Sequence, residues 1–131
     1  MKIESLYQLY KKNFLVDTDT RKIRKGTIYF ALKGENFNGN SFANEALTKG
    51  AVYSIVDEEK YVTSDHIILV NDVLTTLQEL AAYHRLQLNI PVIALTGSNG
   101  KTTTKELINA VLSTAYKTTA TIGNLNNHIG V

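Results

Sequence analysis

Residues 91–104 read Pro-Val-Ile-Ala-Leu-Thr-Gly-Ser-Asn-Gly-Lys-Thr-Thr-Thr. A short apolar run ends in a turn bracketed by Gly97 and Gly100, and the turn leads into Lys101 and three threonines. This order predicts a strand, a phosphate-binding loop and a helix, because backbone N–H groups freed by the glycines and the positive end of a helix both attract anionic oxygens. The alternative is an ordinary strand-to-helix turn that carries an exposed lysine.

Each residue of the loop has an expected role in binding ATP and Mg²⁺. Lys101 is the candidate catalytic residue, since its ammonium would reach the terminal phosphates, and the Thr102 hydroxyl would coordinate Mg²⁺. Thr103 would contact an α- or β-phosphate, while the remaining loop residues would supply backbone amides. The candidate ATP-binding residues are Gly97, Ser98, Asn99, Gly100, Lys101, Thr102 and Thr103.

The loop is shorter than the common consensus. That consensus has four residues between its glycines, which would put a glycine where Leu95 stands, whereas this chain has two.

Composition is that of an ordinary globular domain. The chain has 131 residues, of which 44% are hydrophobic and 20% charged, with a formal charge of +2. So small a net charge argues against nucleic acid as a partner, and the lack of cysteine excludes disulfides and thiolate metal sites. Neither a signal peptide nor a membrane-spanning segment is expected, so the sequence predicts a cytoplasmic protein, taken to be a monomer.

Hydrophobic patterning predicts alternating helices and strands, and therefore an α/β fold. Ser41 and Asp72 are the expected N-caps of the second and third helices. The expected helices cover residues 3–10, 42–49, 72–88 and a stretch after the phosphate loop, and the expected strands cover residues 27–32, 51–56, 66–70 and 92–95.

A boundary near Asn89 to Pro91 predicts two domains of unequal size. Residues 1–89 are long enough for a small mixed α/β domain. Residues 90–131 hold one expected strand, the loop, one helix and a tail, whereas a phosphate-loop ATPase sheet needs further strands and an acidic Mg²⁺ ligand. We therefore expect the chain to be the front part of a longer protein that ends inside a truncated ATPase domain.

Three motifs resemble the ATP-dependent Mur ligases of peptidoglycan synthesis. Residues 96–103 look like the shortened phosphate loop of that family. Thr18-Asp19-Thr20-Arg21, followed by Gly26 and by Phe-Ala-Leu-Lys-Gly-Glu-Asn-Phe-Asn-Gly at 30–39, resembles its uridine-diphosphate-binding N-terminal domain. Gly-Asn-Leu-Asn-Asn-His-Ile-Gly-Val at 123–131 is similar to the asparagine-rich segment of the member that adds D-alanyl-D-alanine.

The resemblance implies a reaction and its substrates. ATP would phosphorylate the terminal carboxylate of a UDP-MurNAc-tripeptide, and the amine of D-alanyl-D-alanine would attack the resulting acyl phosphate. The chain by itself is expected to show no turnover. Two alternatives are a non-catalytic module that binds a UDP-sugar or another nucleotide, and another Mur ligase such as the diaminopimelate- or lysine-adding enzyme.

The resemblance also assigns residues to the UDP-substrate site: Thr18, Thr20, Arg21, Gly34, Glu35, Asn36 and Phe37. Arg21 could pair with a phosphate or with Asp19. The chain departs from the family's commonest pattern at Asn38, usually aspartate, and at Asn40, usually histidine. In the tail, Asn124, Asn126 and Asn127 would contact the nucleotide or the muramyl peptide, or would form a polar turn.

The remaining polar residues suggest structural roles. His66 and His84 have no neighbours at metal-ligand spacing, and residues 57–59, Asp-Glu-Glu, look like an acidic turn.

Overall fold

The computed structural model describes residues 1–122. The chain divides into two compact units, Met1–Leu88 and Asn89–Val131. Among the described residues, every helix is too short or too polar to span a lipid bilayer.

A four-stranded parallel sheet forms the centre of the first unit. Its strands lie in the order in which they occur along the chain, so their carboxyl ends all meet at one edge. The sheet confirms the predicted α/β fold. Its strands are β1 (Val16–Asp17), β2 (Ile28–Phe30), β5 (Tyr53–Val56) and β6 (Ile67–Leu69).

Helices cover both faces of this sheet. Ile28 and Phe30 pack in one core with Leu6 of α1 (Ile3–Tyr10) and Leu80 of α3 (Val73–Gln87). Tyr29 lies between them in the sequence and points to the opposite core, where α2 (Ala43–Thr48) contributes Ala43 and Ala46. This alternation follows from the two-residue period of a strand, and it leaves the strand ends as the part of the sheet free for ligands.

The predicted cap of α3 is confirmed, whereas that of α2 is wrong. The Asp72 carboxylate accepts a hydrogen bond from the Thr75 N–H at 2.6 Å. Ser41 instead donates to the Asn38 carbonyl at 2.8 Å, because residues Gly39–Phe42 form a 3-10 turn that precedes α2. The Asn38 side chain caps that turn by accepting from the Asn40 N–H at 3.0 Å.

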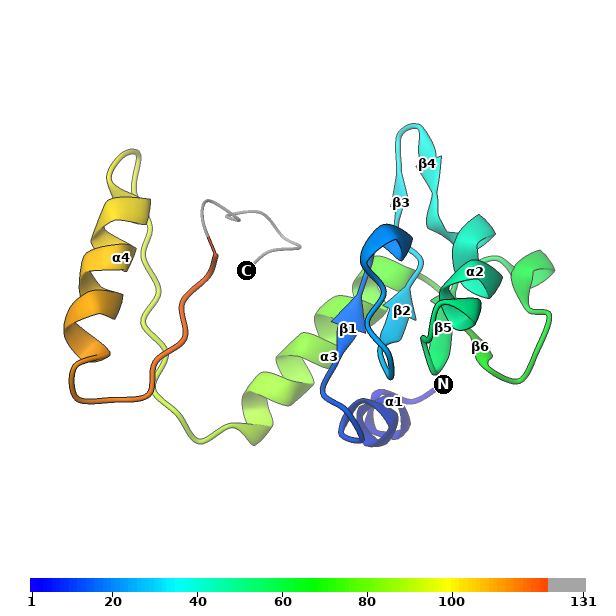
Figure 1. Cartoon of the computed structure of the whole chain (residues 1–131), viewed down its shortest axis with the longest axis horizontal. Helices are drawn as coiled ribbons and strands as arrows, with labels where there is room; N and C mark the ends of the chain where they lie inside the picture. Colours follow the sequence, from blue (N-terminus) through cyan, green and yellow to red (C-terminus); the bar gives the residue numbers. More distant parts are fainter. Residues whose placement is uncertain (123–131) are drawn as a thin grey trace. The chain divides into compact units, whose positions relative to one another are not determined.

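A short hairpin follows β2 and was not predicted. Its strands, β3 (Lys33–Gly34) and β4 (Phe37–Asn38), are antiparallel and are joined by Glu35 and Asn36. Figure 1 shows the hairpin projecting beyond the end of β2.

The second unit contains α4 (Lys101–Leu112), the helix predicted after the phosphate loop. The strand predicted at residues 92–95 is not formed, and this expectation is corrected. A strand exists through its ladder of hydrogen bonds to a neighbour, and residues 89–122 contain no strand with which this apolar run could pair.

Candidate nucleotide and substrate sites

The backbone of the phosphate loop requires its two glycines. Gly97 has a φ of +145° and Gly100 a φ of +78°, and Gly100 is the N-cap of α4. A Cβ atom at either position would meet no atom within 4 Å, so the requirement comes from the dihedral angles and not from crowding. The space beside the loop backbone is open to a ligand.

Lys101 begins α4, and its side chain folds back across the loop. Its ammonium donates to the Gly97 carbonyl and lies 3.5 Å from the Ser98 carbonyl oxygen. The first helical hydrogen bond of α4 runs from the Thr104 N–H to the Gly100 carbonyl, at 2.9 Å. The N–H groups of residues 101–103 therefore have no partner within the helix and can donate to an anion.

Thr102 and Thr103 occupy the exposed second and third positions of α4. The Thr102 hydroxyl is suited to Mg²⁺, which prefers oxygen ligands. In the described part of the chain, no group of three histidine, aspartate or glutamate side chains is placed to hold a metal ion.

The Thr18–Arg21 segment follows the carboxyl end of β1. Arg21 donates to both carboxylate oxygens of Asp19, with Nε at 2.9 Å from Oδ1 and Nη2 at 2.7 Å from Oδ2. These side-chain hydrogen bonds, together with one from the Arg21 N–H, lower the pKa of Asp19 to about 2. The pairing with Asp19 is therefore present, while 85% of the Arg21 side chain remains exposed.

The β3–β4 hairpin presents Gly34, Glu35, Asn36 and Phe37 to solvent. The Phe37 ring stacks on Phe42 with centroids 5.3 Å apart and planes inclined by 13°, and about half of Phe37 is exposed. The hairpin therefore offers polar groups at its turn and an aromatic surface beside them.

The buried Tyr29 contacts the end of the β3–β4 hairpin and is influenced by the charge of Asp19. Its hydroxyl donates to the Gly39 carbonyl at 3.1 Å, just beyond the hairpin. Burial, followed by the charges of Asp19 and Glu45, raises the pKa of Tyr29 to about 12. Since β1 and β2 are parallel neighbours, the segments that follow them share one edge of the sheet, where ligands of open α/β sheets usually bind.

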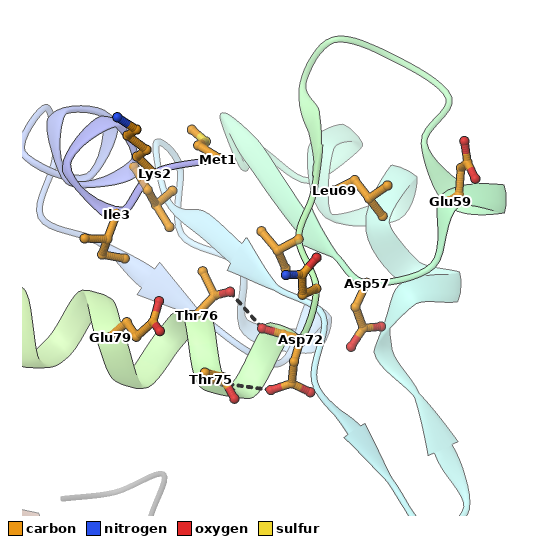
Figure 2. Close-up of a pocket in the computed structure, with 13 residues that line it drawn as sticks. Met1, Lys2, Ile3, Asp57, Glu59, Leu69, Asp72, Thr75, Thr76 and Glu79 are labelled. Carbon is orange, nitrogen blue, oxygen red and sulfur yellow. Dashed lines mark hydrogen bonds between the residues drawn. The ribbon is translucent and has the colours of Figure 1, made fainter.

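A cavity of about 520 Å³ lies farther along the same edge, beyond β5 and β6 (Figure 2). The Asp72 side chain stands in its wall and caps α3, as the dashed line to Thr75 shows. None of the predicted site residues lines this cavity. Its lining residues are Met1, Lys2, Ile3, Leu6, Asp57, Glu59, Leu69, Val70, Asn71, Asp72, Thr75, Thr76 and Glu79.

Sequence reasoning missed a polar cluster at the base of the hairpin. Asp57, interpreted above as part of an acidic turn, is 5% exposed in its side chain and pairs with the Lys33 ammonium at 2.8 Å. Asn38 and Asn40 belong to the same cluster. Their departure from the commonest family pattern was the signal that could have directed attention to them.

The two histidines of the first unit make structural contacts. His84 Nδ1 lies 3.2 Å from the Tyr7 hydroxyl, and His66 Nδ1 lies 3.0 Å from the Val52 carbonyl oxygen. Asn124, Asn126 and Asn127 lie outside the described residues.

Comparisons with known proteins agree with this architecture. The model of the Mur ligase family catalytic domain matches residues 15–97, and the model of the Mur ligase middle domain matches residues 95–131. Relatives that bear the name UDP-N-acetylmuramoyl-tripeptide--D-alanyl-D-alanine ligase include proteins from Bacillus subtilis and Escherichia coli. The Bacillus subtilis protein is 46% identical over 118 residues, and the match covers 88% of this chain and 26% of the relative. The Escherichia coli protein is 45% identical over 116 residues, and the match covers 88% of this chain and 25% of the relative.

A solved structure gives the same result. The MurF ligase from Thermotoga maritima in complex with ADP superposes with a TM-score of 0.79 at 35% identity, covering 88% of this chain and 27% of that one. The chain thus spans about a quarter of the length of the relatives it matches. On the match over residues 15–97 and the shared fold, the chain belongs to the Mur ligase family.

Proposed function

We propose that this chain is part of an ATP-dependent ligase that joins D-alanyl-D-alanine to a UDP-MurNAc-tripeptide in the cytoplasm. The observation that carries the proposal is the phosphate loop, with two glycines in positive-φ conformations and the Lys101 ammonium lying across it. The names of the relatives and the ADP complex of the Thermotoga maritima protein support the choice of substrates.

The residues of the loop fit a nucleoside triphosphate with Mg²⁺. The N–H groups of residues 101–103 would hold phosphate oxygens, and Thr102 would be one ligand of the metal. Lys101 would exchange its contacts with the Gly97 and Ser98 carbonyls for phosphate oxygens and balance their charge during transfer. ATP, when bound, supplies the phosphoryl group that activates the tripeptide carboxylate toward the incoming amine.

The first unit would bind the uridine diphosphate part of the tripeptide substrate. The Thr18–Arg21 segment and the Gly34–Phe37 hairpin follow neighbouring parallel strands, so their hydroxyl, amide and guanidinium groups can converge on one ligand. Thr20 is held in place by the Lys49 ammonium, which donates to its carbonyl at 3.0 Å.

Residues 1–131 by themselves are proposed to bind substrates without turnover. The described part of the second unit supplies Lys101 and Thr102 but no cluster of carboxylates to complete a Mg²⁺ site. In this respect the isolated chain would behave as the binding module considered above.

Isothermal titration calorimetry on the 131-residue chain tests both parts of the proposal. The chain is titrated separately with UDP-MurNAc-tripeptide and with ATP·Mg²⁺, and UDP-MurNAc-dipeptide serves to distinguish this ligase from the one that adds the third amino acid. We expect the tripeptide to bind tightly and ATP weakly, with no phosphate release when D-alanyl-D-alanine is added. Failure to bind the tripeptide would refute the substrate assignment, and D-alanyl-D-alanine-dependent phosphate release would refute the lack of turnover.

A further inference from the structure

The base of the β3–β4 hairpin is fixed by a buried side-chain amide. Asn40 is 0% exposed and pairs reciprocally with Asp57. Its Nδ2 donates to Asp57 Oδ1 at 2.9 Å, and its Oδ1 accepts from the Asp57 N–H at 3.0 Å. Nδ2 also donates to Asn38 Oδ1 at 3.0 Å. Because the pair needs a donor and an acceptor on one side chain, neither an aspartate nor an apolar residue can replace this amide.

Both arms of the hairpin contact the carboxylates that follow β5, Lys33 both of them and Asn38 that of Glu58. Lys33, which begins β3, lies 2.8 Å from Asp57 Oδ1 and 3.6 Å from Glu58 Oε1. Asn38, which ends β4, donates through Nδ2 to Glu58 Oε1 at 2.9 Å. Asp57 and Glu58 directly follow β5, so an inner strand of the sheet anchors the start and the end of the hairpin together.

The Asp57 carboxylate is held in its charged form. Burial alone would raise its pKa, but hydrogen bonds from Lys33, Asn40 and the Val73 N–H outweigh this effect and lower the pKa below the ordinary value for an aspartate. The contact with the Val73 N–H is 3.4 Å long and lies at the beginning of α3. The anchor thus joins the hairpin to both the sheet and a helix.

The hairpin needs such an anchor. Each of its strands has two residues, and a free hairpin of that size is at best marginally stable in water. The turn that it presents carries Gly34, Glu35, Asn36 and Phe37, the residues assigned to the uridine site. Any loosening at the base would spread these residues over many orientations, of which few would match the nucleotide.

We propose that Asn40 and Asp57 are positioning residues of the uridine-nucleotide site, which hold the Gly34–Phe37 hairpin in its binding orientation without touching the ligand. This inference rests on the proposed function of the first unit. It differs from a general role in stability, because it requires that affinity for the nucleotide fall by more than the loss of fold stability explains.

The test compares variants of the 131-residue chain by calorimetry with UDP-MurNAc-tripeptide and by amide hydrogen exchange in the absence of ligand. Asn40→Ala removes the amide, and Asn40→His keeps one N–H donor for Asp57. Ser54→Ala is the matched control, since it removes a different buried hydrogen bond, from Ser54 Oγ to the Ala43 carbonyl at 2.8 Å, in which no hairpin residue takes part. Glu58→Ala is a milder second variant, because this side chain is 25% exposed, and it keeps the test usable if Asn40→Ala does not fold.

We expect Asn40→Ala to weaken tripeptide binding about tenfold or more and to speed amide exchange at residues 35–37. The apparent affinity falls because the hairpin spends a smaller fraction of the time in its binding orientation. Glu58→Ala should weaken binding about threefold, Asn40→His should recover most of the loss, and Ser54→Ala should stay within about twofold of the wild type. If the wild type binds but Asn40→Ala and Glu58→Ala bind no more weakly than Ser54→Ala, the positioning role is refuted and the proposed function stands. A wild type that does not bind the tripeptide refutes both.

Discussion

Gly39 lies where the chain leaves the hairpin, and replacing it with alanine tests the packing there. A Cβ atom at this position would lie 2.4 Å from the Leu32 carbonyl oxygen and 2.6 Å from the Ala31 carbonyl carbon. Both are backbone atoms in the segment that follows β2, so no side chain can rotate away. The backbone would have to move by at least about 0.6 Å for the closest contact to reach 3.0 Å.

The cost of this movement follows from what it disturbs. Gly39 donates its N–H to the Leu32 carbonyl at 3.0 Å and accepts from the Tyr29 hydroxyl at 3.1 Å. Overpacking in a closely packed region costs about 1 to 3 kcal/mol, and weakening two hydrogen bonds adds about 1 kcal/mol. We therefore expect Gly39→Ala to lower the free energy of unfolding of the first unit by about 2 to 4 kcal/mol, and its Tm by about 10 to 25 °C.

Urea unfolding followed by tyrosine fluorescence measures this change, because six of the seven tyrosines lie in residues 1–88 and the chain has no tryptophan. Gly34→Ala is the control. A Cβ atom on Gly34, in the same hairpin, would meet no atom within 4 Å, so this variant should unfold within about 0.5 kcal/mol of the wild type. A Gly39→Ala variant as stable as Gly34→Ala would refute the steric argument.

Three further predictions concern charges. Lys101→Met should weaken ATP·Mg²⁺ binding at least about tenfold in calorimetry, while tripeptide binding stays unchanged; equal ATP affinity would contradict the assigned role. Asp72→Ala should lower the free energy of unfolding by about 1 kcal/mol in urea, since the Thr75 N–H loses its cap, and an unchanged urea midpoint would contradict it. NMR titration should give Asp19 a pKa of about 2, and this pKa should return toward 3.8 in Arg21→Ala. The stabilisation from the pair is therefore complete above pH 4 and is lost as the pH falls toward 2. An Asp19 with an unshifted pKa would contradict the pairing.

The elements predicted correctly are those with local signals. The β-branched and apolar runs around β2 and β6 are continuous, that around β5 is interrupted only by Ser54, and Asp72 directly precedes a helical pattern. The cap of α2 failed because Ser41 satisfies a local rule that a competing turn, capped by Asn38, overrides. The strand expected at 92–95 failed because strand formation depends on a neighbour and not on the run itself.

The candidate sites divide in the same way. Residues 97–103 are contiguous, so their spacing alone predicts a helix N-terminus preceded by a glycine turn, and both are present. The cluster of Asn40 with Asp57 joins positions 17 residues apart. The sequence of residues 57–59 does not indicate that the Asp57 carboxylate is buried while Glu59 is exposed. That difference depends on which strand end meets the hairpin.

The glycines of the two sites serve opposite physical needs, and this separates the two functions experimentally. Gly39 is required because its surroundings are full, so its replacement should damage the fold and the proposed uridine site together. Gly97 and Gly100 are required because of their positive φ angles, with open space around them. A side chain at either position would strain the exposed phosphate loop at a cost of about 1 to 2 kcal/mol per residue. It would also disturb the backbone N–H groups that can donate to phosphate, but the core of residues 1–88 would stay intact. Substitutions at Gly100 should therefore weaken ATP binding, by about 5- to 30-fold from the strain alone, in chains that still bind the uridine nucleotide.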